Sequence, residues 1–178
     1  MPEFESTMRV RAERIRLLVL DVDGVLTDGS IQYTSAGEEI KSFSILDGLG
    51  LKLARRAGVD SAIITGRRSP MVERRAAEMG ITHCMQGRED KLQALCELLG
   101  NLDLSLEQTA YMGDDLPDLA AIRAAGLGLT VANAGAGVAR HAAWQSQARG
   151  GHGAVREACE WLLRLRGQWD GLVTDYLD

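Results

Sequence analysis

The sequence predicts an α/β protein with three layers, in which a doubly wound, mostly parallel (Rossmann-like) sheet lies between two layers of helices. Three observations support this. Short apolar runs alternate with segments of helical periodicity along most of the chain. These apolar runs are continuous, which is typical of parallel strands that are buried on both faces. Several of the runs end at acidic residues or glycine, at the edge where open α/β sheets bind their ligands.

The composition favours one globular domain without a membrane or nucleic-acid partner. A chain of 178 residues can bury one sizeable core. The net charge of −5 argues against a surface that neutralises nucleic-acid phosphates. No apolar run approaches the roughly 20 residues that span a bilayer. Three scattered cysteines, each expected to be a small core residue, favour a reducing compartment, and we expect a cytoplasmic protein.

We divide the chain into three parts. Residues 1–8 are polar and unpatterned, and we expect a flexible leader there. Residues 9–166 are predicted to form the single domain. Residues 167–178 form a polar tail, from which apolar residues such as Trp169 either reach a neighbouring subunit or belong to a frayed terminus.

The first predicted strand, residues 17–20, leads directly to two carboxylates. Leu17-Leu-Val-Leu is followed by Asp21 and Asp23. A buried, unpaired carboxylate is costly, so these two need a cation, a hydrogen-bonding loop or a chemical role. Taken alone, the stretch also fits a simple turn at Gly24.

A hairpin, a helix and a second strand are predicted next. Residues 27–43 carry apolar positions around a turn-like Ser-Ala-Gly-Glu and predict a β-hairpin beside the two aspartates. Helical spacing from residue 47 to 57 ends before Gly58. The apolar run 59–64 then delivers Thr65, Gly66 and Arg67 to the same edge of the sheet.

The remaining elements repeat this alternation. Ser69-Pro70 is a good helix start, with a capping hydroxyl before proline, and Gly80 follows the expected end at Met79. A capping box is expected at residues 105–108. The other predicted elements are strands at 81–85, 109–112 and 127–131, and helices at 89–99, 119–125, 138–144 and 154–165.

Acidic residues gather at two predicted strand ends. Asp21 and Asp23 follow the first strand, and three more follow the strand 109–112, namely Asp114, Asp115 and Asp118. A hard divalent cation is the natural compensation for such a cluster, and Mg²⁺ fits best because His and Cys ligands for zinc are missing.

A phosphate bound at this cation would meet Thr65, Gly66 and Lys91, which together neutralise its oxygens. Asp21 is then the candidate nucleophile, since a carboxylate can attack phosphorus and form an aspartyl-phosphate. Asp23 is the candidate acid and base for the leaving alcohol and the attacking water.

Four segments, in this order, resemble the motifs of the haloacid dehalogenase superfamily of phosphatases. They are Asp21-Val-Asp-Gly-Val-Leu-Thr, Thr65-Gly-Arg, Lys91 and Gly113-Asp-Asp-x-x-Asp118. The resemblance implies a Mg²⁺-dependent phosphatase with Asp21 as nucleophile, Asp23 as acid/base and backbone-carbonyl metal ligand, and Thr65 and Lys91 as phosphate ligands. It further implies that Asp114 binds the metal, while Asp115 and Asp118 tune the metal site and orient Lys91.

Residues 15–163 are similar, more narrowly, to the 3-deoxy-D-manno-octulosonate 8-phosphate phosphatases. The segments that carry this are Gly37-Glu-Glu-Ile-Lys-Ser-Phe43, Ile63-Ile-Thr-Gly-Arg-Arg68 and Gly150-Gly-x-Gly-Ala-Val-Arg-Glu157. One departure is Leu46, where many relatives have arginine. The resemblance implies a small-molecule substrate, an eight-carbon sugar-acid phosphate of lipopolysaccharide biosynthesis.

Superfamily members often carry a cap domain after the first motif or between Thr65 and Lys91, but this chain has only a hairpin and one short strand-helix unit there, so we expect no cap domain. The family resemblance implies a homotetramer in which neighbouring subunits roof each site. Tyr33 and Phe43 on the hairpin are then candidate interface residues, unless they pack within the base of the hairpin. Arg67 and Arg75 are candidates for the sugar carboxylate, with surface solvation as the alternative for Arg75.

Two other functions remain open at this stage. A non-catalytic, receiver-like module also gathers acids and a lysine at the edge of such a sheet, but it does not need an acid/base at Asp23. Within the enzymes, a nine-carbon sugar-acid 9-phosphate is the alternative substrate.

Overall fold

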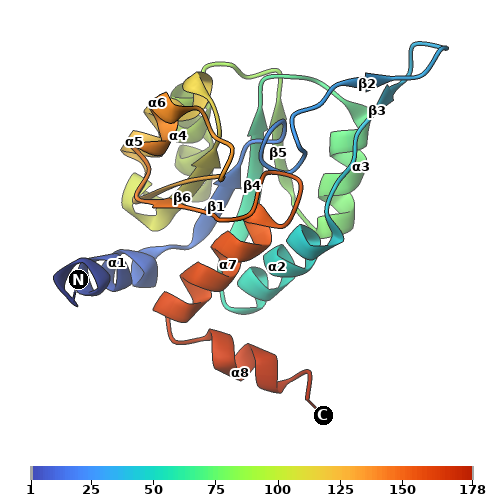
Figure 1. The fold of residues 1–178 in the computed structure, drawn as a ribbon. Coiled ribbons are helices and arrows are strands. Elements are labelled where there is room, and N and C mark those ends of the chain that lie inside the picture. The colour runs from blue at the N-terminus through green and yellow to red at the C-terminus, as the bar shows by residue number, and fades with distance from the viewer. Residues whose placement is uncertain (1, 178) are drawn as a thin grey trace.

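A six-stranded parallel sheet runs through the centre of the molecule, in the order β5-β4-β1-β6-β7-β8 (Figure 1). The computed structural model describes residues 2–177. The strands are β1 (Leu17–Leu20), β4 (Asp60–Thr65), β5 (His83–Gln86), β6 (Thr109–Gly113), β7 (Leu127–Thr130) and β8 (Trp144–Gln145). The predicted three-layer α/β fold is confirmed.

Helices cover both faces of the sheet. On one face lie α1 (Pro2–Arg14), α2 (Ile45–Arg56), α3 (Pro70–Met79) and α7 (Ala154–Leu165), and on the other lie α4 (Lys91–Leu102), α5 (Leu119–Ala124) and α6 (Ala136–Ala139). In β1, Leu18 and Leu20 pack into the first core while Leu17 and Val19 pack into the second. Burial on both faces is why this strand is apolar at every position.

The segment between β1 and α2 contains the predicted hairpin. Its two short antiparallel strands are β2 (Gln32–Tyr33) and β3 (Glu39–Ile40), and they project beyond the sheet at the upper right of Figure 1. The described residues between β1 and α2 hold no larger insertion, in agreement with the expected lack of a cap domain. Tyr33 is exposed, whereas Phe43 packs against the main core.

The N-terminal segment differs from the expected leader. Residues 2–8 belong to helix α1, and Met8 is buried together with Ala12 and Ile15 in the main core. Burial of these three side chains anchors the helix, although its residues show no clear apolar stripe from which a helix could be predicted.

Three local predictions are wrong. Helix α4 continues past Gly100 and ends at Leu102, and the next residue, Asp103, adopts the left-handed conformation with φ 53°. The expected helix 138–144 ends early, because Trp144 pairs with Leu129 as β8 and stacks on Trp161 at 5.1 Å. Cys96 is exposed rather than a core residue.

The C-terminal tail begins with a short helix, α8 (Trp169–Thr174), which packs on the domain. Trp169 is buried against Leu53 and Leu163. The guanidinium groups of Arg156 and Arg164 lie 5.4 and 5.1 Å from the centre of its ring. Trp169 therefore belongs to the core of its own chain and not to a free tail.

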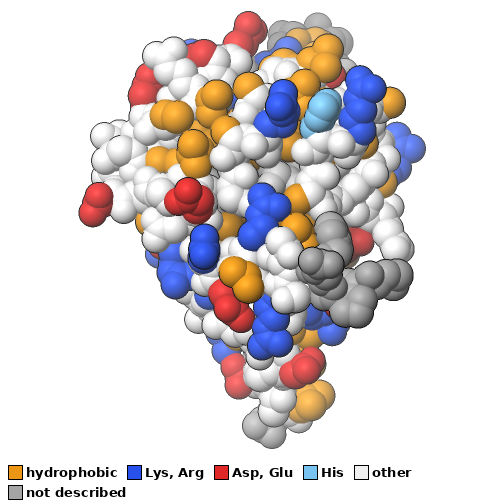
Figure 2. Space-filling model, turned by 90° about the vertical axis from the view of Figure 1, so that its left-hand side faces the viewer, with side chains coloured by type: hydrophobic (Ala, Val, Ile, Leu, Met, Phe, Trp, Pro, Cys, Tyr) orange, Lys and Arg blue, Asp and Glu red, His pale blue; other side chains and the backbone are white. Residues whose placement is uncertain are grey.

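Charged side chains of both signs are interspersed over the described part of the face in Figure 2, with hydrophobic side chains between them. This mixture reflects the near balance of 20 basic and 25 acidic residues. Among residues 2–177, no helix is long and apolar enough to cross a membrane.

Candidate active site

The carboxyl ends of β4, β1 and β6 meet at one edge of the sheet and surround a cavity of about 350 Å³. Because these strands are neighbours, the residues that follow them come together although they are distant in sequence. Nine of the ten predicted site residues line the cavity: Asp21, Asp23, Thr65, Gly66, Arg67, Lys91, Asp114, Asp115 and Asp118. The tenth, Arg75, does not.

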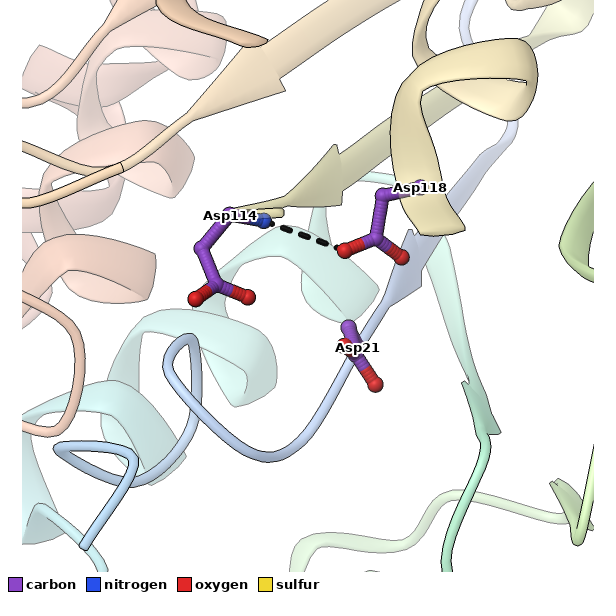
Figure 3. A group of neighbouring side chains, drawn as sticks. All are labelled: Asp21, Asp114 and Asp118. Atoms are coloured by element: carbon purple, nitrogen blue, oxygen red, sulfur yellow. Dashed lines mark hydrogen bonds between the residues drawn. The ribbon is translucent and has the colours of Figure 1, made fainter. Parts of the chain in front are cut away.

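Three carboxylates converge at the floor of this cavity (Figure 3). Asp21 follows β1, Asp114 follows β6 and Asp118 ends the short turn of helix after it, and one carboxylate oxygen from each lies within 4.8 Å of the others. Gly24 permits this approach. Its φ of +94° favours glycine, and a Cβ there would lie 2.1 Å from Asp114 Oδ2.

Burial and neighbouring charges raise the pKa values of Asp21 and Asp114. Burial, followed by the charge of Asp118, raises the pKa of Asp21 to about 6, against the opposing effect of Lys91. Burial and the charges of Asp118, Asp21 and Asp115 raise the pKa of Asp114 to about 7. The negative charges of the cluster are therefore not fully compensated at neutral pH by the positive charge of Lys91.

The donor set fits a hard divalent cation. In the part of the chain that the structure describes, this group offers only carboxylate oxygens, without His or Cys. Oxygen ligands of this kind suit Mg²⁺, which takes one or two carboxylates and retains waters for a phosphate. Asp23 is not one of the three converging carboxylates, which is compatible with the backbone-carbonyl role that the family resemblance implies for it.

Lys91 supplies the one buried cation of the cavity wall among the described residues. It is the first residue of α4 and its side chain is 3% exposed. Its Nζ donates to the carbonyl oxygen of Ile64 at 2.9 Å and lies 2.8 Å from Asp21 Oδ1. It is 3.3 Å from Asp118 Oδ1. These contacts hold the ammonium group beside the candidate nucleophile.

Asp118 is itself held by its surroundings. Its Oδ2 accepts from the backbone amides of Asp114 and Asp115, at 3.2 and 3.4 Å. Its Oδ1 accepts from the Tyr111 hydroxyl at 2.8 Å. Burial and the charge of Asp118 raise the pKa of Tyr111, so that this hydroxyl remains a donor at neutral pH. Asp115 accepts from the amide of Leu116 and caps the turn.

Asp23 faces the hairpin. Its carboxylate is paired with Lys41 Nζ, and Arg67 Nε lies 3.7 Å from it. Glu39 joins the group, 2.9 Å from Arg67 and 3.6 Å from Lys41. No role was predicted for Lys41 or Glu39. The available signal was that they lie two positions apart in the predicted hairpin, Glu39 in β3 and Lys41 directly after it, a spacing that puts side chains of extended chain on one face.

Arg75 lies outside the cavity. Its guanidinium donates to the carbonyl oxygen of Ser44 at 3.0 Å and contacts Glu78 at 3.3 Å. It fills the space above Gly48, where a Cβ would lie 2.7 Å from Nη2. In its own chain, Arg75 supports the start of α2.

A loop before α7 packs against the backbone that follows Asp23, and this contact was not predicted. A Cβ at Gly150 would lie 1.7 Å from the Gly24 carbonyl oxygen, and the Gly151 amide donates to Val25 O at 3.0 Å. Buried Asp47 secures the other end of the loop by accepting from the amide of Arg156 at 2.8 Å.

Comparison with known proteins shows which family this chain resembles. Residues 77–156 match the family model of haloacid dehalogenase-like hydrolases. The 3-deoxy-D-manno-octulosonate 8-phosphate phosphatase of Escherichia coli strain K12 is 46% identical over 160 residues, which is 90% of this chain and 85% of that protein.

Solved structures of similar proteins superpose closely. The same phosphatase from Moraxella catarrhalis, in complex with magnesium ion, phosphate ion and KDO, is 44% identical, with a TM-score of 0.93 over 99% of both chains. The phosphatase from Yersinia pestis is 44% identical, with a TM-score of 0.89 over 93% of this chain and 89% of that one. This chain therefore belongs to the 3-deoxy-D-manno-octulosonate 8-phosphate phosphatase family of haloacid dehalogenase-like hydrolases.

Proposed function

We propose that this chain is a Mg²⁺-dependent phosphatase that converts 3-deoxy-D-manno-octulosonate 8-phosphate to 3-deoxy-D-manno-octulosonate and phosphate, a step of lipopolysaccharide biosynthesis. The observation that carries this is the meeting of Asp21, Asp23, Thr65, Lys91 and Asp114 around one cavity, in a chain of this family. The relative with magnesium, phosphate and KDO bound supports both the substrate class and the metal.

Asp21 is the nucleophile in the first step. One of its carboxylate oxygens forms a bond to phosphorus, and the bond from phosphorus to the sugar oxygen breaks. Lys91, Thr65 and the amide of Gly66 hold the phosphate oxygens and balance the negative charge that spreads over them. Asp23 gives a proton to the leaving alkoxide, so that the free sugar acid departs and an aspartyl-phosphate remains on Asp21.

Asp23 acts in the opposite sense in the second step. It takes a proton from a water molecule, which attacks phosphorus and releases inorganic phosphate from Asp21. Asp21, Asp114 and the backbone carbonyl of Asp23 would hold Mg²⁺, with Asp118 close to them, and Asp115 and Asp118 would keep this arrangement fixed. Bound Mg²⁺ supplies positive charge that neutralises both the acid cluster and the substrate phosphate.

Arg67 is the candidate for the sugar carboxylate. It directly follows the phosphate-binding Thr65-Gly66 and lines the cavity, half-exposed at its mouth. A guanidinium group suits a carboxylate because it donates two parallel hydrogen bonds. Arg75 does not line this cavity, and its guanidinium contacts Ser44 and Glu78 instead.

A homotetramer is the proposed assembly. The hairpin exposes Ile31, Tyr33 and Ile40, with exposed fractions of 52%, 62% and 45%. Exposed apolar side chains on a projecting element are typical of an interface between chains. A neighbouring subunit over the cavity would exclude water from the aspartyl-phosphate, as a cap domain does elsewhere. The proposed compartment is the cytoplasm, and the three free cysteines fit it.

The test is phosphate release with Mg²⁺ from a panel of sugar-acid phosphates. We expect the eight-carbon 8-phosphate to be the best substrate. A preference for a nine-carbon 9-phosphate would identify that compound as the substrate instead. No phosphate release from any compound of the panel would favour a non-catalytic module.

Two variants test the assignment of the carboxylates. Asp21→Asn should lower kcat by about 10³-fold or more, because it removes the nucleophile. Asp23→Asn should lower kcat by about 10²–10⁴-fold, as expected for loss of an acid/base. Asp103→Asn is the matched control: this aspartate is exposed, and asparagine also accepts its positive φ. Full activity in Asp21→Asn would exclude the covalent mechanism.

A further inference from the structure

Tyr111 is a polar residue in an apolar position. It lies in the middle of β6, is fully buried, and packs in the second core with Leu17, Val19 and Leu95. Phenylalanine would fill the same space without bringing a hydroxyl group into the core. Burial of a hydroxyl group costs free energy unless the group is hydrogen-bonded, so the Tyr111 hydroxyl needs a partner.

The partner is the carboxylate of Asp118, at the floor of the proposed active site. The hydroxyl of Tyr111 donates to Asp118 Oδ1 at 2.8 Å. The other oxygen, Oδ2, is held by the backbone amides of Asp114 and Asp115. Both oxygens are therefore held in place. Within residues 2–177, Tyr111 is the only residue that donates a side-chain hydroxyl to this carboxylate.

Fixing Asp118 also fixes the groups beside it. Asp118 Oδ1 lies 3.3 Å from Lys91 Nζ, and the same Nζ lies 2.8 Å from the nucleophile Asp21. Asp118 is also one of the three carboxylates that converge in the cluster suited to Mg²⁺. A rotation of its side chain would therefore disturb both the lysine and the cation site.

We propose that Tyr111 is a positioning residue, which acts through Asp118 to hold Lys91 and the acid cluster in their working arrangement. It does not line the cavity, so we assign it no direct contact with the substrate. This inference rests on the proposed phosphatase function for its kinetic consequence, and on the acid cluster alone for its effect on the binding of Mg²⁺.

Tyr111→Phe separates this role from simple core packing. The ring still fills the core, so the variant should keep its fold by circular dichroism. We expect kcat to fall and the half-saturating Mg²⁺ concentration to rise, each by about 10- to 100-fold, the usual effect of removing a partner of a metal-site carboxylate. The KM for the sugar phosphate should change much less, because the contacts of the sugar are untouched.

Thr109→Val is the matched control. Thr109 lies on the same strand, is equally buried, and donates to Ser105 O at 3.0 Å at the end of β6 remote from the site. The Thr109→Val variant loses a buried hydroxyl group, as Tyr111→Phe does. We expect its kcat and its half-saturating Mg²⁺ concentration to be unchanged. A double variant adds a second test. If Tyr111 acts through Asp118, Tyr111→Phe should lower kcat no further in an Asp118→Asn background.

Calorimetric titration with Mg²⁺ alone measures the metal affinity without any substrate, so it tests the positioning role separately from the proposed function. If the wild-type chain releases no phosphate from the proposed substrate, the proposed function fails, but weaker Mg²⁺ binding by Tyr111→Phe would still support the positioning role. Unchanged Mg²⁺ binding and unchanged kcat in a folded Tyr111→Phe protein would overturn it. Loss of the fold in this variant would overturn it as well, since the hydroxyl would then be structural.

Discussion

Asp114 is a single residue whose position in the proposed metal site lowers the stability of the metal-free protein at neutral pH. Its pKa is raised to about 7 by burial and by the charges of Asp118, Asp21 and Asp115. Because the folded-state pKa lies above the ordinary value of an aspartate, the metal-free folded chain binds more protons than the unfolded chain between about pH 4 and pH 7. Stability without metal therefore falls as the pH rises through this window.

This gives a prediction for Asp114→Asn in the presence of a chelator. At pH 8 the variant should be more stable than the wild-type protein, by about 1 kcal/mol, since Asp114 is partly exposed and solvent screens its repulsion. The advantage should shrink as the pH falls to 6, where the wild-type side chain becomes protonated. Urea unfolding of both proteins at pH 6, 7 and 8 measures this. A variant that is less stable at pH 8 would contradict the predicted repulsion.

The same residues predict the pH dependence of metal binding. Mg²⁺ requires the ionised carboxylates, so its affinity should fall as the pH decreases through 7 and then 6, the values for Asp114 and Asp21. Binding at pH 7 should release protons. Calorimetric titration with Mg²⁺ in buffers of different ionisation enthalpy measures the release, and an affinity that is constant from pH 8 to pH 6 would exclude the raised pKa values.

The shared location of the principal site residues can be predicted from the sequence because one rule covers them. Asp21, Thr65 and Asp114 each follow a predicted parallel strand, and the ends of such strands meet. The roles of Lys41 and Tyr111 could not be predicted, and the reason is physical. Lys41 reaches Asp23 through the fold of a hairpin, and Tyr111 looks like any core residue until the direction of its hydroxyl is known.

At the scale of elements, the helices and strands with strong local signals were predicted most closely. Helix α7 matches the predicted residues 154–165, because its apolar face repeats regularly along its whole length. Helix α3 begins at Pro70 as expected, although Ser69 makes no side-chain cap hydrogen bond. The failures were α1, the end of α4 and β8. For α1 and β8, contacts with residues distant in sequence decide the structure.

Two glycines, one in the loop before α7 and one in helix α4, predict opposite effects of substitution by alanine. Gly150→Ala should destabilise the protein by about 1–3 kcal/mol and lower activity, because its Cβ would collide with the backbone of Gly24 next to the catalytic loop. Gly100→Ala is the matched control. Gly100 is exposed within α4 with no atom within 4 Å of a Cβ, and alanine there should stabilise the helix by up to about 1 kcal/mol.

Thermal unfolding and phosphate release measured on both variants test this pair. The collision at Gly150 moves the loop that positions Asp23, so activity should fall by more than the fraction of unfolded protein explains. Gly150→Ala with full activity and unchanged stability would mean that the loop before α7 adapts freely and does not support the site.

At the scale of the whole molecule, the fold leaves the cavity accessible at its mouth. The cavity lies at the edge of the sheet, and the hairpin beside it is small compared with a cap domain. The sequence indicated that the chain is capless because no long segment separates the first strand from α2. It did not indicate how the hairpin turns toward Asp23, since this depends on the buried pairing of Lys41 with Asp23 and Glu39.

The hairpin carries the prediction about assembly. Tyr33 is 62% exposed on β2, and a charge in its place should be tolerated by the isolated chain but not by an apolar interface. We expect light scattering to show a tetramer for the wild-type protein and a smaller species for Tyr33→Glu. If a neighbour completes the site, kcat/KM should fall in parallel by about tenfold or more.

Val10→Glu is the control, because it replaces an apolar side chain that is 50% exposed on α1, on an element that does not border the cavity. It should remain tetrameric and active. Recovery of activity in Tyr33→Glu at high protein concentration, together with recovery of the tetramer, would tie the two losses to one cause. A wild-type protein that is monomeric and fully active would show that this chain excludes water from its phosphorylated aspartate without help from a neighbour.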